Sequence, residues 1–361
     1  MSNKVVTIRD IARLSGVAPS TVSRVLNNRY EDIAVTAKTK ARIMGAANEF
    51  GYLPNVHAQR LFAKKSFVLG MVIPTFDRLA GKNGSVYSHV DTLLNETING
   101  VVEAAGARGY HTLMILADEK FISQKDYLNL FRNRSVDGML VWGICMDERY
   151  IEELEIQKKS FVLLNTYHKD KKYNKVYVDN YVGSSQLCRH LLELGHKNIG
   201  YIMGSKKSTI GLDRYDGFVD VLKEAGVFRE DLVAWGDYSF ESGQQACKQI
   251  IEHDPDVTAI GCGNDNMALG AIEVLIEKGF RVPEDISVTG ADASFPFGSP
   301  RLTSIRPPLF EVGKAAAEAL IDQLESKSKK EDKNELIDVC FEPKLVIGNS
   351  TCRIRSDNSI V

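Results

Sequence analysis

Six consecutive residues, Pro19 to Arg24 with the sequence PSTVSR, carry three hydroxyls and one guanidinium and contain no carboxylate. Short hydroxyl side chains can approach phosphate oxygens closely, and an arginine can donate two parallel hydrogen bonds to the edge of a guanine. Residues of these types, grouped this closely, predict contact with duplex nucleic acid.

Two short helices are predicted around this stretch. The hydroxyl of Thr7 and the carboxylate of Asp10 can cap a helix over 8–15, and Gly16 can adopt the positive φ that ends it. Pro19 suits the first turn of a second helix. The apolar positions of that helix are Val22, Val25 and Leu26. Two short helices joined by a glycine turn form a helix-turn-helix. On this pattern alone, two helices that merely pack together are an equal alternative.

A third helix is predicted from Thr36 to Phe50. After it, Pro54 interrupts the chain and Asn55 can cap one more short helix, over 56–62. If two such helices met on DNA, a pair of Leu61 side chains could insert between base steps of the minor groove. An ordinary linker is the alternative for this segment.

Charge is distributed unevenly along the 361 residues. Residues 1–65 hold 11 basic and 4 acidic side chains, for a net charge of +7, whereas the remainder holds 34 basic and 43 acidic side chains, for −9. This asymmetry predicts a polyanionic partner at one end of the chain. The six cysteines include no CxxC pair, so neither a metal site nor a disulfide framework is expected. No membrane-spanning run or secretory signal is evident, and a cytoplasmic location is expected.

From residue 66 onward, apolar runs alternate with amphipathic segments. Buried strands are predicted in a first series, FVLGMVIP, YHTLMILA, VDGMLVWG and FVLLN, and in a second, NIGYIMG, DLVAWG, VTAIGCG and ISVTGAD. Helices are predicted between them near 90–108, 124–134, 147–157, 182–194, 212–225, 240–252 and 265–279. Such alternation predicts two parallel sheets with covered faces. Open sheets of this kind bind ligands beyond the carboxyl ends of their strands.

Polar residues stand at or near the ends of the predicted strands. They are Asn165, Arg214, Tyr238, Asn264, Asp265 and Asp292. An aromatic ring, amides, a carboxylate and a guanidinium in one cleft would suit a polyhydroxylated or nitrogenous small molecule. Each residue also has a structural alternative. Asn and Asp after strands often cap helices, Asp265 especially, and Arg214 could form a surface ion pair.

The segments TIRDIARLSGVAPSTVSRVLNN, VTAKT and GYLPNVHAQRL resemble the DNA-binding headpiece and hinge of the LacI/GalR family of bacterial repressors. The resemblance implies dimers on palindromic operators. It implies that Pro19, Ser20 and Arg24 read bases and that Leu61 is the minor-groove wedge. The residues it implies as DNA-backbone contacts are Thr7, Thr21, Ser23, Asn27, Thr36, Tyr52 and Asn55. The loop 28–34, NRYEDIA, is about three residues longer than is usual in the family.

The segments GHKNIGYIMG, LDRYDGF, GNDNMALGAIEVL and LTSIRPPLFEVGKAAAEAL resemble the family's effector domain, which has a periplasmic-binding-protein-like fold. The residues implied as effector ligands are Phe76, Asn165, Arg214, Tyr238, Asn264 and Asp292. Two departures concern the same site. Leu309 stands where the family usually has an aromatic residue, and the segment 77–87 is longer than usual.

The predicted architecture is a three-helix headpiece (1–54), a hinge helix with linker (55–65) and a two-lobed α/β effector and dimerisation domain (66–361). The N-lobe is expected over about 66–178 and 302–328, and the C-lobe over about 181–292 and 335–354. Crossings between the lobes are expected near 179–181, near 293–301 and within 325–335. No C-terminal leucine heptad follows that would form a tetramer.

The predicted function is a DNA-binding transcriptional regulator without a cofactor. We expect a repressor of a carbohydrate-utilisation operon that binds as a homodimer and responds to a small-molecule effector, a sugar. The alternatives are a nucleobase- or nucleoside-responsive regulator and a DNA-binding protein without ligand response. A periplasmic sugar carrier would need an export signal and no helix-turn-helix. An enzyme is disfavoured because Gly261-Cys262-Gly263 does not complete a dinucleotide loop and no paired catalytic carboxylates are evident.

Overall fold

A computed structural model describes residues 6–26, 35–52, 65–74, 87–143, 149–294, 300–329 and 336–354. The chain divides into two compact units, Met1–Phe67 and Val68–Val361. Several predictions lie outside the described residues: those on Asn27, Asn55, Leu61 and Phe76, the hinge helix over 56–62 and the long loop 28–34.

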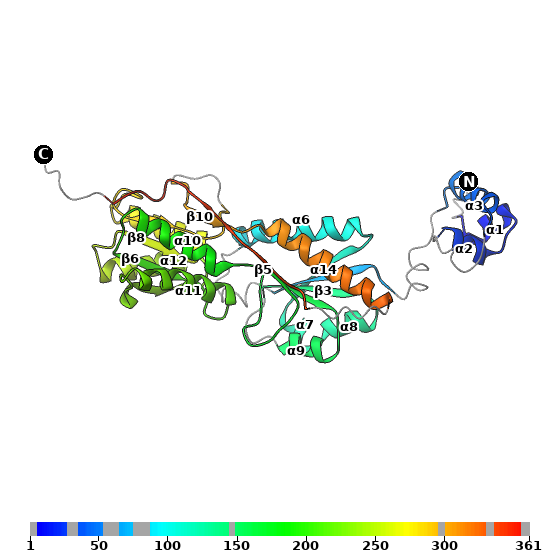
Figure 1. Cartoon of the computed structure of the whole chain (residues 1–361), viewed down its shortest axis with the longest axis horizontal. Coiled ribbons are helices and arrows are strands. Elements are labelled where there is room, and N and C mark those ends of the chain that lie inside the picture. Colours follow the sequence, from blue (N-terminus) through cyan, green and yellow to red (C-terminus); the bar gives the residue numbers. More distant parts are fainter. Residues whose placement is uncertain are drawn as a thin grey trace. The chain divides into compact units, whose positions relative to one another are not determined.

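The first unit is a three-helix headpiece made of α1 (Ile8–Ser15), α2 (Pro19–Leu26) and α3 (Ala37–Glu49) (Figure 1). Thr7 and Asp10 form the predicted capping box of α1, and Gly16 ends that helix at φ 59°. The core between the helices consists of Ile11, Ala12, Val22, Val25 and Ile43. Because the apolar residues of all three helices converge here, the core fixes which side of α2 faces outward.

The second unit contains two parallel sheets and one small antiparallel pair. The larger sheet has the order β11 (Asp338–Phe341), β5 (Lys175–Val178), β4 (Phe161–Leu164), β3 (Gly138–Trp142), β1 (Val68–Pro74) and β2 (His111–Ala117). The smaller sheet has the order β7 (Val233–Trp235), β6 (Ile199–Met203), β8 (Ala259–Cys262) and β9 (Ser287–Thr289). Strand β10 (Ser304–Arg306) pairs with β12 (Lys344–Val346). The predicted headpiece followed by two parallel-sheet α/β regions is confirmed.

Helices cover both faces of each sheet (Figure 1). The larger sheet lies between α6 (Tyr87–Ala107) with α14 (Leu309–Lys329) and a second layer of α7 (Glu119–Ser123), α8 (Asp126–Arg132) and α9 (Arg149–Ile156). In the smaller sheet, α10 (Asn180–Glu193) and α11 (Thr209–Glu224) cover one face, while α12 (Phe240–His253) and α13 (Asp265–Glu277) cover the other. Helices α6 and α14 pack closely, since a Cβ on Gly100 would lie 2.0 Å from the carbonyl oxygen of Phe310.

Two details differ from the sequence-based expectation. The predicted helix over 124–134 is the shorter α8, and the sequence did not predict the short helix α7 before it, from which Lys125 at φ 55° helps to separate α8. The final crossing was expected within 325–335, but Asp338–Phe341 pairs in parallel with β5 in the larger sheet. The chain therefore passes on to β12 only after Phe341. Strand β11 has four residues with largely exposed side chains, so no buried apolar run marks it in the sequence.

Candidate nucleic-acid interface and small-molecule site

Helix α2 presents the residues predicted to contact nucleic acid on its outer side. Val22 and Val25 are buried in the headpiece core, while Pro19, Ser20 and Arg24 are exposed. Ser20 and Arg24 are four residues apart and so lie on one face of the helix. Thr21 and Ser23 are partly buried beside them. The described part of α2 thus offers a narrow outer face with short hydroxyls and one cation and without a carboxylate.

Three further predicted residues have structural roles in the headpiece. The Thr7 hydroxyl donates to Asp10 Oδ2 at 2.6 Å, and the Thr36 hydroxyl accepts a hydrogen bond from the backbone N–H of Thr39 at 3.3 Å. Both residues therefore stand at helix N-termini, where anions are favoured. Tyr52 packs against the headpiece core, and burial raises the pKa of its phenol. The remaining exposed cations of the described headpiece are Arg9, Arg13, Lys38, Lys40 and Arg42.

In the second unit, the guanidinium of Arg214 is the centre of a buried network. Its Nη2 donates to Asp292 Oδ1 at 2.7 Å, its Nη1 to the carbonyl oxygen of Gly263 at 2.7 Å, and its Nε to Asn180 Oδ1 at 3.0 Å. The Arg214 and Asp292 side chains are only 11% and 6% exposed. A surface ion pair, the structural alternative for Arg214, is therefore wrong.

The two acids that follow β8 and β9 have different partners. Asp292 accepts from Arg214, and its backbone stands at φ 131°, held by a hydrogen bond from its N–H to the Ile305 carbonyl. Asp265 instead accepts from the Ser304 hydroxyl at 2.6 Å and from the Ser294 N–H at 2.8 Å. Burial, followed by the charge of Asp292, raises the pKa of Asp265 to about 7.

Asn264, not Asp265, caps helix α13. Its Oδ1 accepts from the Met267 N–H at 3.0 Å, and its Nδ2 donates to the carbonyl oxygen of Tyr238 at 3.0 Å. Tyr238 has φ 72°, and its ring lies against Gly204, where an added Cβ would come within 2.2 Å of the ring. Since Asn264 is bonded to Gly263 along the chain, these contacts join Tyr238 to the Arg214 network.

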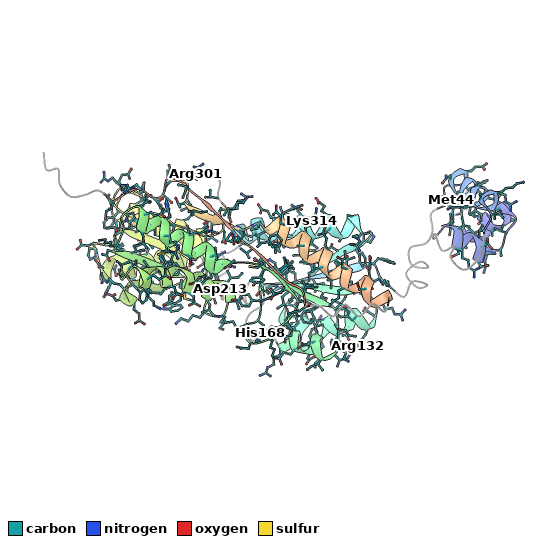
Figure 2. The ribbon with its side chains drawn as sticks, viewed as in Figure 1. Met44, Arg132, His168, Asp213, Arg301 and Lys314 are labelled. Carbon is teal, nitrogen blue, oxygen red and sulfur yellow. The ribbon has the colours of Figure 1, made fainter. Side chains whose placement is uncertain are left out.

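Asn165 directly follows β4 and has φ 52°, and its side chain makes no hydrogen bond to the described residues. The two residues after it reach helix α11, which carries Arg214. Thr166 lies 3.4 Å from the Thr209 hydroxyl, and the Tyr167 hydroxyl donates to Asp213 Oδ1 at 2.6 Å. Figure 2 shows Asp213 where α11 faces the part of the unit that contains the larger sheet. The structure thus brings the Asn165 loop and the Arg214 helix together.

Sequence reasoning missed two residues of this unit, Asn180 beside Arg214 and Trp142 at the end of β3. Asn180 accepts a hydrogen bond from Arg214. It follows the short strand β5, and no pattern in the neighbouring sequence indicates that it lies beside Arg214. Trp142 ends β3 next to β4, and its buried indole Nε1 has no hydrogen-bond partner among the described residues. A buried unpaired donor is costly, so this N–H is a candidate for contact with a ligand or a water.

The described residues provide no group of three or more histidine, cysteine, aspartate or glutamate side chains that could hold a metal ion. Cys188, Cys247 and Cys262 are free and buried, and burial raises the pKa of the first two to about 12. Among the described helices, none combines the length and apolar character that a bilayer crossing requires. The network around Arg214 consists of side-chain and backbone groups of the described residues.

Known proteins match this chain over nearly its whole length. Residues 7–55 match the model of bacterial regulatory proteins of the lacI family, and residues 188–351 match the periplasmic binding protein-like domain. The HTH-type transcriptional repressor PurR of Pectobacterium carotovorum subsp. carotovorum is 34% identical over 331 residues, which cover 89% of this chain and 91% of that protein.

Two solved structures share the fold. The complex of the transcriptional regulator CelR with cellobiose has a TM-score of 0.70 at 26% identity and covers 96% of this chain and 99% of that one. The lac repressor dimer bound to operator and the anti-inducer ONPF has a TM-score of 0.77 at 24% identity and covers 97% of this chain and 100% of that one. The second likeness, at this identity, bears on the fold alone.

Proposed function

The chain belongs to the LacI family of bacterial regulatory proteins and is a DNA-binding transcriptional repressor, and from this premise we propose that it binds a palindromic operator as a homodimer under the control of a sugar. Its place of action is then the cytoplasm, where operators lie. The observation that carries the DNA-binding part is the outer face of α2, with Arg24 exposed and no acid beside it.

Direct base reading by Arg24 can be tested by comparing its substitution with the substitution of another exposed arginine, Arg13. Binding of a two-fold symmetric duplex selected from the protein's own genome is measured by fluorescence anisotropy, with a random duplex alongside. Arg24→Ala should weaken binding to the selected site by about 1–3 kcal/mol and relax preference at one base pair. Arg13→Ala, which removes an exposed arginine of α1 paired with Asp10, is the control. Equal losses on both duplexes for Arg24→Ala would exclude direct readout.

A homodimer is supported by the outer strand of the larger sheet. Strand β2 is an edge strand, and Leu113, Met114 and Leu116 on it are exposed, the last to 65%. Val102 on the neighbouring helix α6 is also exposed. Exposed apolar side chains on an edge strand and on the helix beside it are typical of an interface. A second copy of the chain is the proposed partner at this edge.

The proposed effector site comprises Asn165, Arg214, Tyr238, Asn264 and Asp292, and Phe76 stays a prediction from the sequence. Carboxylate, guanidinium and amide groups in one buried network suit the hydroxyls of a sugar. The cellobiose complex of the relative CelR supports this class of ligand. The Trp142 indole offers one more donor at the end of β3.

The effector class can be tested by thermal unfolding of the dimer with cellobiose, ribose and adenosine, each at millimolar concentration. A specific binder should raise the unfolding temperature because it stabilises the native state by mass action. Operator affinity should then change with the same compound, since the two binding events are linked. Stabilisation by adenosine alone would contradict the sugar proposal. An unchanged operator affinity with a bound sugar would contradict the control by effector.

A further inference from the structure

We propose that Asn180 is a positioning residue that holds the Arg214 guanidinium in the orientation an effector meets, and that it ties this guanidinium to the first segment passing between the two sheets. The inference rests on the effector site proposed above. It concerns a residue that itself is not among the proposed effector ligands.

Asn180 is held in one orientation by two hydrogen bonds. It follows β5 after one residue, opens helix α10 and is buried. Its Nδ2 donates to the carbonyl oxygen of Val178 at 3.1 Å, and its Oδ1 accepts from Arg214 Nε at 3.0 Å. The amide nitrogen is the only group of this side chain that can donate to a carbonyl. The amide oxygen is consequently the atom that faces Arg214.

The plane of the guanidinium is set by three acceptors, one for each nitrogen. Asn180 accepts from Nε, the Gly263 carbonyl from Nη1 and Asp292 from Nη2. A guanidinium has five N–H groups, so one N–H on each Nη is left over within the described part of the chain. Without Asn180, the group could rotate about its bonds to the other two acceptors. With Asn180, the two remaining N–H groups point in a fixed direction.

Two of these three bonds, those to Asn180 and Asp292, connect Arg214 to two separate passages of the chain. Asn180 lies where the chain leaves the larger sheet for helix α10. Asp292 lies after β9, and its N–H donates to the carbonyl oxygen of Ile305 in β10. Segments that pass between two lobes absorb the backbone change when the lobes close on a ligand. An effector that engages Arg214 therefore acts on both passages, and Asn180 supplies the link to the first.

Three variants separate positioning from general support of the fold. Asn180→Leu removes the acceptor at similar size, and Asn180→Asp retains an acceptor for Arg214. Asn174→Leu is the matched control. The Asn174 amide also makes one donor bond, to the Phe161 carbonyl at 3.4 Å, and one acceptor bond, from the Ile337 N–H at 2.9 Å, and neither involves Arg214.

The first measurement needs no effector. In a ¹H–¹⁵N spectrum of the full-length dimer, the Nε–H signal of Arg214, assigned by its loss in Arg214→Lys, should exchange slowly with water. It should stay protected in Asn174→Leu and Asn180→Asp and exchange at least tenfold faster in Asn180→Leu. Equal protection in Asn180→Leu would overturn the proposal. Should Asn180→Leu not fold, rapid exchange in the wild type or in folded Asn180→Asp would overturn it as well.

The second measurement uses cellobiose and adenosine as probes in calorimetric titrations. Whichever of the two the wild type binds should bind Asn180→Leu at least about tenfold more weakly, as expected for loss of a hydrogen bond to a charged group. It should bind Asn174→Leu unchanged. Unchanged affinity in Asn180→Leu counts against positioning. Failure of the wild type to bind either probe counts against the proposed effector class, and the exchange measurement then decides the role of Asn180 by itself.

Discussion

The buried pair of Arg214 and Asp292 predicts a large loss of stability from a small change, Asp292→Asn. The two side chains lie 2.7 Å apart and are only 11% and 6% exposed. Asparagine has the shape of aspartate and also tolerates positive φ, which matters because Asp292 stands at φ 131°. The substitution therefore removes the negative charge while leaving the backbone and the packing in place.

The size of the expected stability loss follows from the buried charge that the substitution leaves without its partner. Loss of one member of a buried ion pair leaves an uncompensated charge and costs about 3–5 kcal/mol. The lower end applies here, because Asn180 and the Gly263 carbonyl still accept from Arg214 and the new amide oxygen can accept from Nη2. We expect the free energy of unfolding to fall by about 3 kcal/mol. The same change at Asp322, whose partner Arg108 is 36% exposed and which is itself 65% exposed, should cost less than about 1 kcal/mol.

The assay is equilibrium unfolding in urea, followed by far-ultraviolet circular dichroism at a fixed protein concentration. Asp292→Asn should move the transition of the second unit to lower urea without changing its slope. Asp322→Asn should leave the midpoint close to that of the wild type. If the two variants lower the free energy of unfolding by the same small amount, the Arg214–Asp292 pair is not a buried pair in solution and the reasoning is wrong.

Three further predictions concern other parts of the second unit. Burial raises the pKa of Asp265 to about 7 from an unfolded value near 3.8, so the folded state binds the extra proton and stability should fall as pH rises through that window, by up to about 1.4 kcal/mol per unit. The unfolding temperature should fall less between pH 5 and pH 8 in Asp265→Asn than in the wild type. An equal fall in both proteins would contradict this. Leu116→Glu should shift the proposed dimer toward monomer in light scattering, whereas Ile276→Glu, which alters an exposed apolar residue of the smaller sheet's helix α13, should not. In the variant Trp235→Phe, Trp142 is the one remaining tryptophan. Its fluorescence emission should change when a stabilising sugar binds. An unchanged emission spectrum would place Trp142 outside the site.

Local features of the fold could be predicted because they depend on neighbouring residues. Thr7 and Asp10 are three residues apart, the spacing of a capping box, and Gly16 follows at the position that a left-handed cap requires. The long apolar runs became the central strands of both sheets, since strands buried on both faces need continuous apolar side chains. Strand β11 could not be found in this way, because it lies at an edge and exposes most of its side chains.

The candidate site was predicted in part. Strand ends indicated Asn165, Asn264 and Asp292, because parallel sheets gather polar residues at their carboxyl edges. The sequence could not show which of Asn264 and Asp265 caps the next helix, because both follow β8 and either could act as the cap. The structure assigns the cap to Asn264 and gives Asp265 the Ser294 and Ser304 partners.

By itself, the sequence determined the headpiece, the two α/β regions and the charge difference between residues 1–65 and the rest of the chain. These could be predicted because caps, hydrophobic periods and composition are local properties of a chain. Only the tertiary structure decided what Arg214 does. Its three acceptors come from Asn180, Gly263 and Asp292, which are 34, 49 and 78 residues away along the chain. No local pattern encodes such separations. They arise when strands and helices pack, and burial then makes each of these hydrogen bonds matter.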